Sequence, residues 1–527
     1  MEKRLKIFMT DNIKEKILVI FLFILAFYVN FQSANKGVFP IDTFLHYDSA
    51  SRILENTYPI KDFWVVHGIT IDYLQSVFFF IFGNNWLAYV AHASIFNSLI
   101  SISTYIFFNH LGVKKLYSCV LAISFAVLAY PISGTPFIDQ HAIFFCLLAF
   151  YFFSFGIKAK LKYLFFIPFF LGLAFFSKQV PTIYFAFVLG FLFLVYAFVN
   201  KDYSILKYPL LGTITFFFLL YFFLELQNIS IKSFLTQIFY YPMSIGGDRY
   251  AALNIDIKKI LSNYKFILLP ILITLFLIKN QYGKVFKNLR IFNFSIVILF
   301  NLISIFHQLM TKNQNFIFFL IPINLAFLIL FLEDKFETNR HKNKLIFLVI
   351  IFCIFTTFKY HHRFNVERKF IDLQDVKLTN SVDAKKIHYS LYPLKWKTRN
   401  FNNPIDEIKI VSNVIKKLEN EKNEIILMTN YNFISTLTNK KIYALSKTYD
   451  SISFPNKSNT YYSQFKKFFD NKIKLKKITH IYLFFTNKDE LDYGLERYIL
   501  EYYNLDCLKI DNLENYLIKV DLTNCVI

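Results

Sequence analysis

Long apolar segments separated by short polar connections fill the first 358 residues of the chain. About eleven of these segments run for roughly 15 to 23 residues, a length typical of membrane-spanning helices. No small-residue cleavage site follows the first segment, so it is predicted to remain as an anchor. We therefore expect a polytopic α-helical membrane region, with spans near residues 17–34, 86–109, 116–132, 137–155, 163–177, 180–199, 206–226, 263–279, 291–308, 315–332 and 344–358.

The pattern changes beyond Lys359. Apolar runs shrink to strand length and alternate with helix-like stretches, which predicts a small C-terminal α/β domain over 359–527, after a transmembrane region over 1–358. This domain has neither a GxGxxG motif nor a Walker lysine loop. The expected strands cover 424–428, 442–445, 480–485 and 516–520, and the expected helices cover 404–421 and 460–474.

Basic residues before Lys359 gather in every second connection between the expected spans. By the positive-inside rule these connections are cytoplasmic. The N-terminus is therefore expected in the cytoplasm, and the first long loop and the C-terminal domain on the outer face. The residues that carry this pattern are Lys3, Arg4, Lys6, Lys14, Lys16, Lys114, Lys115, Lys158, Lys160, Lys162, Lys201, Lys207, Lys279, Lys284, Lys287, Arg290, Lys335, Arg340, Lys342 and Lys344.

Composition agrees with a membrane protein, because 55% of the residues are hydrophobic and only 18% are charged. The net charge of +22 comes largely from the basic connections, so no nucleic-acid partner is predicted. Three cysteines lie within expected spans, where a thiol behaves as a small hydrophobe. Cys507 and Cys525 lie in the outward domain, where an oxidising compartment would allow them to pair. No cysteine or histidine pattern indicates a bound metal.

Carboxylates mark the outward end of two expected spans. Asp42 and Asp48 follow the first span, and Asp139 stands at the start of the fourth. A carboxylate in such a place reaches both a lipid-borne and a water-borne substrate, so these residues are candidate general bases. Helix capping is the structural alternative for Asp42 and Asp139. On a helix from Thr43, Asp48 would pair with Arg52 at i,i+4, which makes Asp48 more structural than Asp42.

Cations, amides and imidazoles gather at the same expected face. Lys178 and Lys312 are exceptions among the short outward connections, and Arg249 follows a Gly-Gly pair that we expect to form a turn in the long loop 227–263. These three are candidates for binding a phosphate, although single lysines there are also typical of snorkelling anchors. Further candidate binding residues are His46, His67, His141, Gln179 and His307.

Four stretches together resemble the GT-C glycosyltransferases: IDTFLHYDSASRIL, PIKDFWVVHGITIDYLQSVFFFIFGNNW, PFIDQHAIFF and LGLAFFSKQVP. The resemblance covers the chain to about residue 360. The acidic pair usual in that superfamily is here Asp42-Thr43. The resemblance implies transfer of a sugar from a polyprenyl-phosphate donor to a hydroxyl of a cell-envelope acceptor, with inversion, in the bacterial cytoplasmic membrane and with a periplasmic C-terminal domain.

Within that expectation Asp42 supplies the base, with Asp48 and Asp139 as substitutes, and Arg249, Lys178 or Lys312 binds the donor phosphate. No cofactor is assigned, and a divalent metal is left open. The stretch from Tyr73 to Phe82 is a candidate wall for the polyprenyl tail, since aromatic residues favour the membrane interface. The C-terminal domain is expected to pack over the Asp42 loop and to help select the acceptor.

Other function classes also gather charges in a membrane protein. A transporter or flippase of lipid-linked glycans would place them near the midplane and often has internal repeats, whereas here they lie at span ends and no repeat is found. A glycan polymerase or ligase, and a non-catalytic sensor or assembly subunit, remain alternatives.

Overall fold

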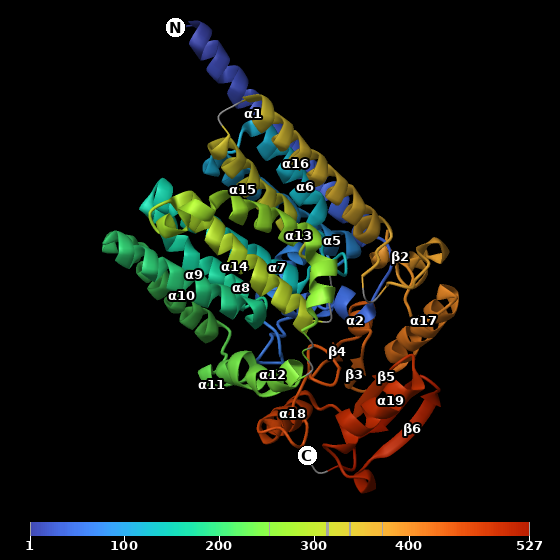
Figure 1. Ribbon diagram of the computed structural model, residues 1–527. Helices are drawn as coiled ribbons and strands as arrows, with labels where there is room; N and C mark the ends of the chain where they lie inside the picture. The colour runs from blue at the N-terminus through green and yellow to red at the C-terminus, as the bar shows by residue number, and fades with distance from the viewer. Residues whose placement is uncertain are drawn as a thin grey trace.

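The computed structural model describes residues 2–251, 253, 255–311, 316–336, 339–370 and 373–525. A helix forms in each of the segments predicted to span the membrane (Figure 1). These helices are α1 (Glu2–Ala34), α5 (Trp86–Leu111), α6 (Lys115–Leu128), α7 (Ile138–Lys158), α8 (Ile167–Phe175), α9 (Gln179–Asn200), α10 (Lys207–Leu226), α13 (Ile257–Ile278), α14 (Leu289–Met310), α15 (Leu320–Lys335) and α16 (Asn339–Tyr360).

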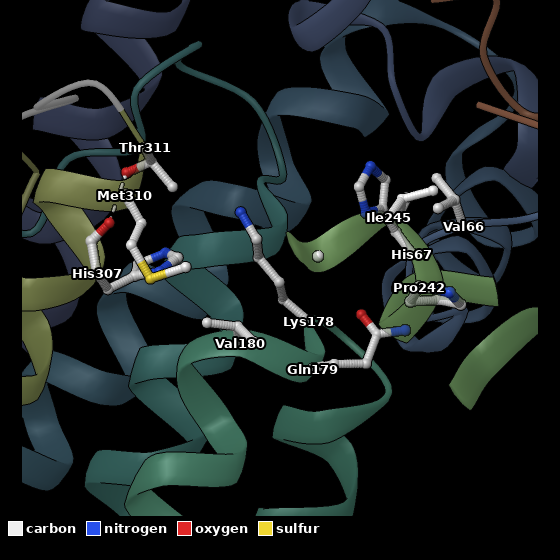
Figure 2. Close-up of a pocket in the computed structure, with 11 residues that line it drawn as sticks. Val66, His67, Lys178, Gln179, Val180, Pro242, Ile245, His307, Met310 and Thr311 are labelled. Carbon is white, nitrogen blue, oxygen red and sulfur yellow. Dashed lines mark hydrogen bonds between the residues drawn. The ribbon is translucent and has the colours of Figure 1, made fainter. Parts of the chain in front are cut away.

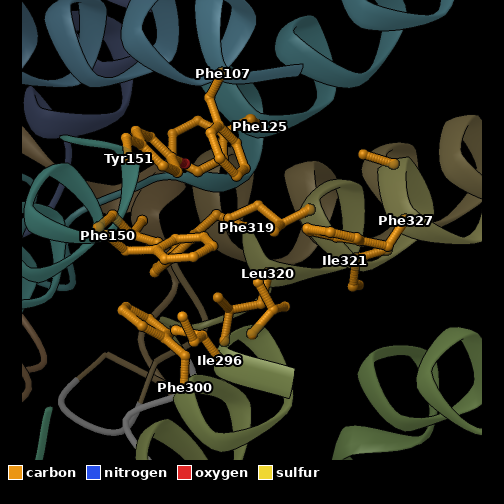
Figure 3. Packing of buried hydrophobic residues seen from close by; sticks show 14 of the residues in the cluster. Phe107, Phe125, Phe150, Tyr151, Ile296, Phe300, Phe319, Leu320, Ile321 and Phe327 are labelled. Atoms are coloured by element: carbon orange, nitrogen blue, oxygen red, sulfur yellow. The ribbon is translucent and has the colours of Figure 1, made fainter. Parts of the chain in front are cut away.

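Eight helical segments of the described chain are long and apolar enough to cross a membrane. Of the remaining predicted spans, α6 and α8 are shorter, and α15 has 16 residues. The number of helices that cross therefore stays a prediction. The residues of α15 from Leu320 to Leu332 are all buried, which places this helix inside the bundle. Figure 3 shows Phe319, Leu320 and Phe327 surrounded by side chains of neighbouring helices.

Outer helices of the bundle expose apolar side chains. Only 11% of the most apolar window of the segment Tyr203–Leu226 is buried, and Phe217 and Phe218 in α10 are 60% and 65% exposed. Water disfavours such a surface, whereas lipid tails accept it. The fold is that of a polytopic helical membrane protein.

Short polar signals set several helix ends. The Asn85 side chain accepts a hydrogen bond from the Ala88 amide and caps α5, which ends where Gly112 adopts a left-handed conformation (φ 101°). In the C-terminal domain, Asn403 caps α17 (Pro404–Asn420), whose first residue is proline. These local preferences explain why the boundaries were readable from sequence.

Three short helices connect α1 to α5: α2 (Pro40–Thr43), α3 (Tyr47–Leu54) and α4 (Thr70–Phe82). The single helix expected from Thr43 is wrong, because the helical conformation is interrupted between Thr43 and Tyr47. The hydroxyl of Thr43 accepts a hydrogen bond from the Phe39 amide at 3.0 Å, which holds α2 as a separate turn.

The long connection between α10 and α13 is mostly helical. It contains α11 (Ile231–Leu235), a π-helical turn η3 (Thr236–Tyr240) and α12 (Tyr241–Ala251). Gly246 and Gly247 lie inside α12, so the expected Gly-Gly turn is wrong. Neither glycine has a positive φ, and both continue the helix.

The C-terminal domain is an α/β sandwich. Its sheet has the order β4-β3-β5-β7-β6, in which β4, β3 and β5 are parallel and β7 is antiparallel to β5 and β6. Alternate residues of β3 face opposite layers, since Leu427 packs with α17 and Met428 with α18 (Tyr462–Lys476). The strands are β3 (Ile425–Thr429), β4 (Ile442–Tyr443), β5 (His480–Phe484), β6 (Lys509–Glu514) and β7 (Leu517–Asp521).

The four predicted strands and two predicted helices of this domain are confirmed. Within the five-stranded sheet, the strand that was not predicted is β6, which lies at the sheet edge and is largely exposed and polar, so it has no apolar run. Helix α19 (Lys488–Leu495) and a two-stranded ribbon of β1 (Val382–Asp383) and β2 (Lys395–Trp396) complete the domain. Cys507 and Cys525 form a disulfide bond.

The domain is docked onto the segment between α1 and α4, and it lies at one end of the bundle (Figure 1). The Phe44 and Phe433 rings stack with centroids 4.1 Å apart. The Trp64 amide donates to the Leu445 carbonyl at 2.8 Å, and the Lys447 amide donates to the Trp64 carbonyl at 2.9 Å. The expectation that the domain packs over the Asp42 loop is therefore confirmed.

Candidate functional site

A cavity of about 100 Å³ lies at the end of the bundle that carries the C-terminal domain. Its volume is enough for several water molecules. Figure 2 shows Lys178 in the middle of the lining, with His307 on one side and Ile245 of α12 on the other. Four of the predicted binding residues meet here, since the lining includes His67, Lys178, Gln179 and His307 beside apolar residues such as Val66 and Ile245.

Lys178 is held by a buried carboxylate. Its Nζ lies 2.7 Å from each carboxylate oxygen of Asp139, and His307 Nε2 makes a further hydrogen bond to Asp139 Oδ1. Asp139 is the second residue of α7, Lys178 immediately precedes α9, and His307 lies in the last turn of α14. The cluster therefore joins three helices at one level of the bundle.

Lys178 and His307 line one wall of the cavity, whereas Asp139 is behind them and is only 1% exposed. An entering group therefore meets the ammonium first. The Asp139 carboxylate balances the charge of that ammonium, so an anionic ligand would be bound by charge-assisted hydrogen bonds and not by a net positive charge.

Two structural alternatives for these residues are wrong. Helix α7 has Phe137 at its N-cap and no side-chain capping hydrogen bond, so Asp139 does not cap it. Lys178 is only 8% exposed and is ion-paired, so it is not a snorkelling anchor.

A second buried cluster joins the C-terminal domain to α3 and α4. Lys447 Nζ lies 2.8 Å from both carboxylate oxygens of Asp72. Asp72 Oδ1 also accepts a hydrogen bond from Ser49 Oγ at 2.5 Å and lies 2.7 Å from His46 Nδ1. The break between α2 and α3 directs His46 and Ser49 toward Asp72 on α4.

Burial shapes the protonation of this cluster. Burial, with the Lys447 charge nearby, lowers the pKa of His46 to about 4, so its imidazole is neutral. Burial by itself would raise the pKa of the Asp72 carboxyl, but Lys447 and His46 outweigh it and lower that pKa to about 2. Asp72 and Lys447 therefore remain a charged pair at neutral pH.

A chain of hydrogen bonds runs through His141 and His92. His141 Nδ1 lies 3.0 Å from the Phe137 carbonyl, which only accepts, so this nitrogen carries the proton. His141 Nε2 then accepts from His92 Nε2 at 3.3 Å, which leaves His92 Nδ1 as an acceptor facing the Gln75 amide at 2.9 Å. When the Gln75 side-chain amide is oriented with its nitrogen toward His92, that nitrogen donates to His92 Nδ1. The chain of hydrogen bonds is then complete, with both imidazoles neutral.

Asp48 forms the predicted i,i+4 pair with Arg52, with Nε 2.8 Å from Oδ2. Ser435 of the C-terminal domain donates a further hydrogen bond to Asp48. Asp42 lies inside α2 and is partly exposed; because α2 begins at Pro40 with Phe39 at the N-cap, the capping alternative for Asp42 is wrong.

Other predicted residues have varied positions. Gln179 Nε2 donates to the Ile238 carbonyl at 3.0 Å and fixes η3 beside the cavity. Arg249 belongs to α12, but its side chain is not among those that the structure describes, and Lys312 lies outside the described residues. Neither donor-phosphate assignment is therefore tested.

Sequence reasoning missed Asp72, Lys447 and His92. Asp72 had a usable signal, because an acidic residue in an apolar helix at a membrane is rarely accidental. Lys447 had none, since it is one of many lysines in the C-terminal domain and its partner is distant in the chain.

No three His, Cys, Asp or Glu side chains converge as metal ligands in the ranges that the structure describes. No protein-family model matches the chain, and no curated protein is significantly similar to it in sequence.

Proposed function

We propose that this protein is a membrane glycosyltransferase that moves a sugar from a polyprenyl-phosphate donor to a hydroxyl of a cell-envelope acceptor. The observation that carries the proposal is the cavity with Lys178 on its wall. Residues from four separate sequence regions, including His67, Gln179 and His307, meet there at the ends of helices. The GT-C resemblance of the sequence around these residues agrees with the same chemistry.

The donor phosphate is assigned to the Lys178 wall. Negative charge builds on the phosphate as the bond to the sugar breaks, and a buried ammonium stabilises that charge. The Asp139 carboxylate keeps Lys178 in place from behind, with both N–O distances at 2.7 Å. Apolar lining from Val66 and Ile245 suits the first carbons of a lipid chain.

Asp42 is assigned the base. Asp48 is only 5% exposed and Asp139 only 1%, so both carboxylates are poorly accessible to an acceptor hydroxyl. Asp42 is partly exposed on α2, in the segment on which the C-terminal domain docks. It takes the proton of the acceptor hydroxyl while that oxygen bonds to the anomeric carbon and the phosphate leaves, which inverts the configuration.

Helix α4 supports a place at the membrane interface. Its polar residues Asp72 and Gln75 are buried, whereas Phe80 and Ile81 are 80% and 61% exposed. Because its polar side chains are buried and its apolar side chains are exposed, α4 is suited to contact with lipid. We assign its exposed face to binding the polyprenyl tail.

The proposal includes the bacterial cytoplasmic membrane, a cytoplasmic N-terminus and a periplasmic C-terminal domain, from the distribution of basic connections. A transporter or flippase is less well supported. Asp139, Lys178 and His307 lie at helix ends, whereas a transport site is typically near the membrane midplane.

Purified protein in lipid nanodiscs, incubated with a panel of polyprenyl-phosphate sugars, tests the proposal. We expect release or transfer of sugar from at least one donor, and its loss in Asp42→Asn. Asp375→Asn, which changes an exposed carboxylate outside the lining of the cavity and of the cleft, is the matched control and should behave as wild type. If no donor yields product, or if Asp42→Asn and wild type are equally active, the proposal or its base is wrong.

A further inference from the structure

A second opening lies between the end of α3 and the C-terminal domain. This cleft has a volume of about 320 Å³, which falls at the lower end of small-molecule sites. One wall comes from α3 and the turn before α5, and the other from residues 435–442 of the C-terminal domain. Representative lining residues are Ser51, Glu55 and Asn84 on the first wall and Ser435, Asn439 and Lys441 on the second.

The lining of the cleft is almost entirely polar and of mixed character. Carboxylate oxygens accept, ammonium groups donate, and hydroxyls and amides do both. A simple anion would face the carboxylates of Asp48 and Glu55. An apolar ligand would displace water from the polar lining without replacing the hydrogen bonds of that water. A ligand rich in hydroxyl groups both donates and accepts, and so matches this wall.

The walls are held in place by hydrogen bonds between the two halves of the chain. Arg52 donates to the Ile442 carbonyl at 2.7 Å, and Ser435 donates to Asp48. Glu55, Asn439 and Lys441 are exposed at the rim. The walls of the cleft are therefore held rigidly, and the side chains at its mouth are accessible. A preformed site of this kind lowers the entropy cost of ligand binding.

One segment of the chain connects the cleft to the cavity with Lys178. Residues 440–442 line the cleft, and the same segment continues to Lys447, which pairs with Trp64 through the backbone. Val66 and His67, next to Trp64, line the cavity. The cleft thus lies at the junction between the membrane helices and the C-terminal domain, and the backbone pairing at Trp64 links it to the residues of the cavity wall.

We propose that this cleft binds the carbohydrate part of the acceptor. Its role as an acceptor site rests on the proposed glycosyl transfer; its ability to hold a carbohydrate does not. The hydroxyl-rich ligand lies between α3 and residues 435–442, with Asn439 and Lys441 in contact with it.

A binding measurement without any donor tests this. Full-length protein in nanodiscs is titrated with a panel of soluble oligosaccharides built from neutral, amino and acidic sugars, and binding is followed by saturation-transfer NMR. Asn439→Trp fills the cleft from an exposed position, and Lys441→Ala removes one contact. The matched control is Asn504→Trp, an exposed asparagine of the same domain outside the cleft.

We expect wild type and Asn504→Trp to bind at least one oligosaccharide, Asn439→Trp to lose binding, and Lys441→Ala to bind about tenfold more weakly. Absence of binding in wild type, or unchanged binding in Asn439→Trp, overturns the inference. Specific binding without transfer from any donor supports a carbohydrate cleft and rejects glycosyl transfer. Transfer with an unchanged acceptor KM in Asn439→Trp rejects the cleft and leaves the proposed function intact.

Discussion

Lys447 and Asp72 are 375 residues apart in the chain, and the Lys447 ammonium lies 2.8 Å from each oxygen of the Asp72 carboxylate. Both side chains are almost completely buried. Because one belongs to the C-terminal domain and the other to α4, this pair fixes the domain on the membrane helices. The cleft lies at that junction, so its two walls depend on the docking of the domain.

Lys447→Met is expected to lower the free energy of unfolding by about 3–5 kcal/mol, because it leaves the Asp72 charge buried without its cation. Thermal unfolding and protease release of the C-terminal domain measure the effect. Lys417→Met is the matched control: Lys417 also lies 2.7 Å from a carboxylate, Glu514, but both are partly exposed, so a loss of no more than about 1 kcal/mol is expected. Equal losses in the two variants would contradict a special role for Lys447.

Acidification is expected to destabilise the protein through His46. Its pKa is about 4 in the folded chain and about 6.5 in the unfolded chain, so between these values the unfolded chain binds an additional proton. The free energy of unfolding therefore falls as the pH drops from 6.5 to 4, by a total on the order of 3 kcal/mol. Asp72 extends the loss of stability below pH 4. Because its pKa is lowered to about 2 in the folded chain, the stability that this carboxylate contributes is lost as the pH falls from about 4 to 2.

Unfolding followed against pH in wild type and in His46→Gln checks this expectation. The variant should lose stability less steeply between pH 6.5 and 4. His388→Gln, which changes an exposed histidine, should follow the wild-type curve. A wild-type stability that is flat across this window would show that His46 titrates normally.

Lys178 and Asp42 are expected to affect different kinetic constants. Lys178→Met should weaken donor binding, whereas Asp42→Asn should lower turnover by roughly two to four orders of magnitude with donor affinity little changed. Donor binding and turnover are measured side by side. The double variant Lys178→Met/Asp139→Asn removes the unpaired buried charge, and so separates lost binding from lost folding. Normal donor affinity in both Lys178 variants would show that the donor phosphate does not bind at Lys178.

Loss of the Cys507–Cys525 disulfide is expected to destabilise the C-terminal domain. The two cysteines are 18 residues apart. In the chain-entropy model, loss of a disulfide that closes a loop of this length raises the entropy of the unfolded chain and lowers the free energy of unfolding by about 3 kcal/mol. Unfolding of the Cys507→Ser/Cys525→Ser variant measures the change. Reductant should shift wild type by a similar amount and leave the variant unaffected; a wild type insensitive to reductant would argue against the bond.

The N-terminus is expected in the cytoplasm and the C-terminal domain on the outer face. An alkaline phosphatase reporter fused after residue 527 should be active, because it needs an oxidising compartment, and a fluorescent protein at the N-terminus should report the cytoplasm. Activity of the phosphatase only at the N-terminus would reverse the orientation, and with it the face on which the donor is used.

Local physical preferences explain which elements could be predicted from the sequence. A run of apolar residues as long as a bilayer forms a helix whatever surrounds it, because its backbone must satisfy its own hydrogen bonds, and the predicted spans are all helical. The strands of the C-terminal domain follow from short apolar runs, and the Asp48–Arg52 pair follows from i,i+4 spacing on α3. That Lys178 and Gln179 would meet His307 at one face followed from counting spans.

The partners of the charged groups depend on tertiary packing and could not be predicted from the sequence. The Asp139–Lys178–His307 cluster needs three helices at one level, and the Lys447–Asp72 pair needs the domain docked on α4. A buried charge takes whichever opposite charge the packing places within reach, and no local pattern encodes that choice. His46 binds Asp72 for the same reason, because tertiary packing brings α3 and α4 together. Gly246 and Gly247 continue α12, whose first residue, Tyr241, is held to the C-terminal domain by a hydrogen bond to the Ile452 carbonyl.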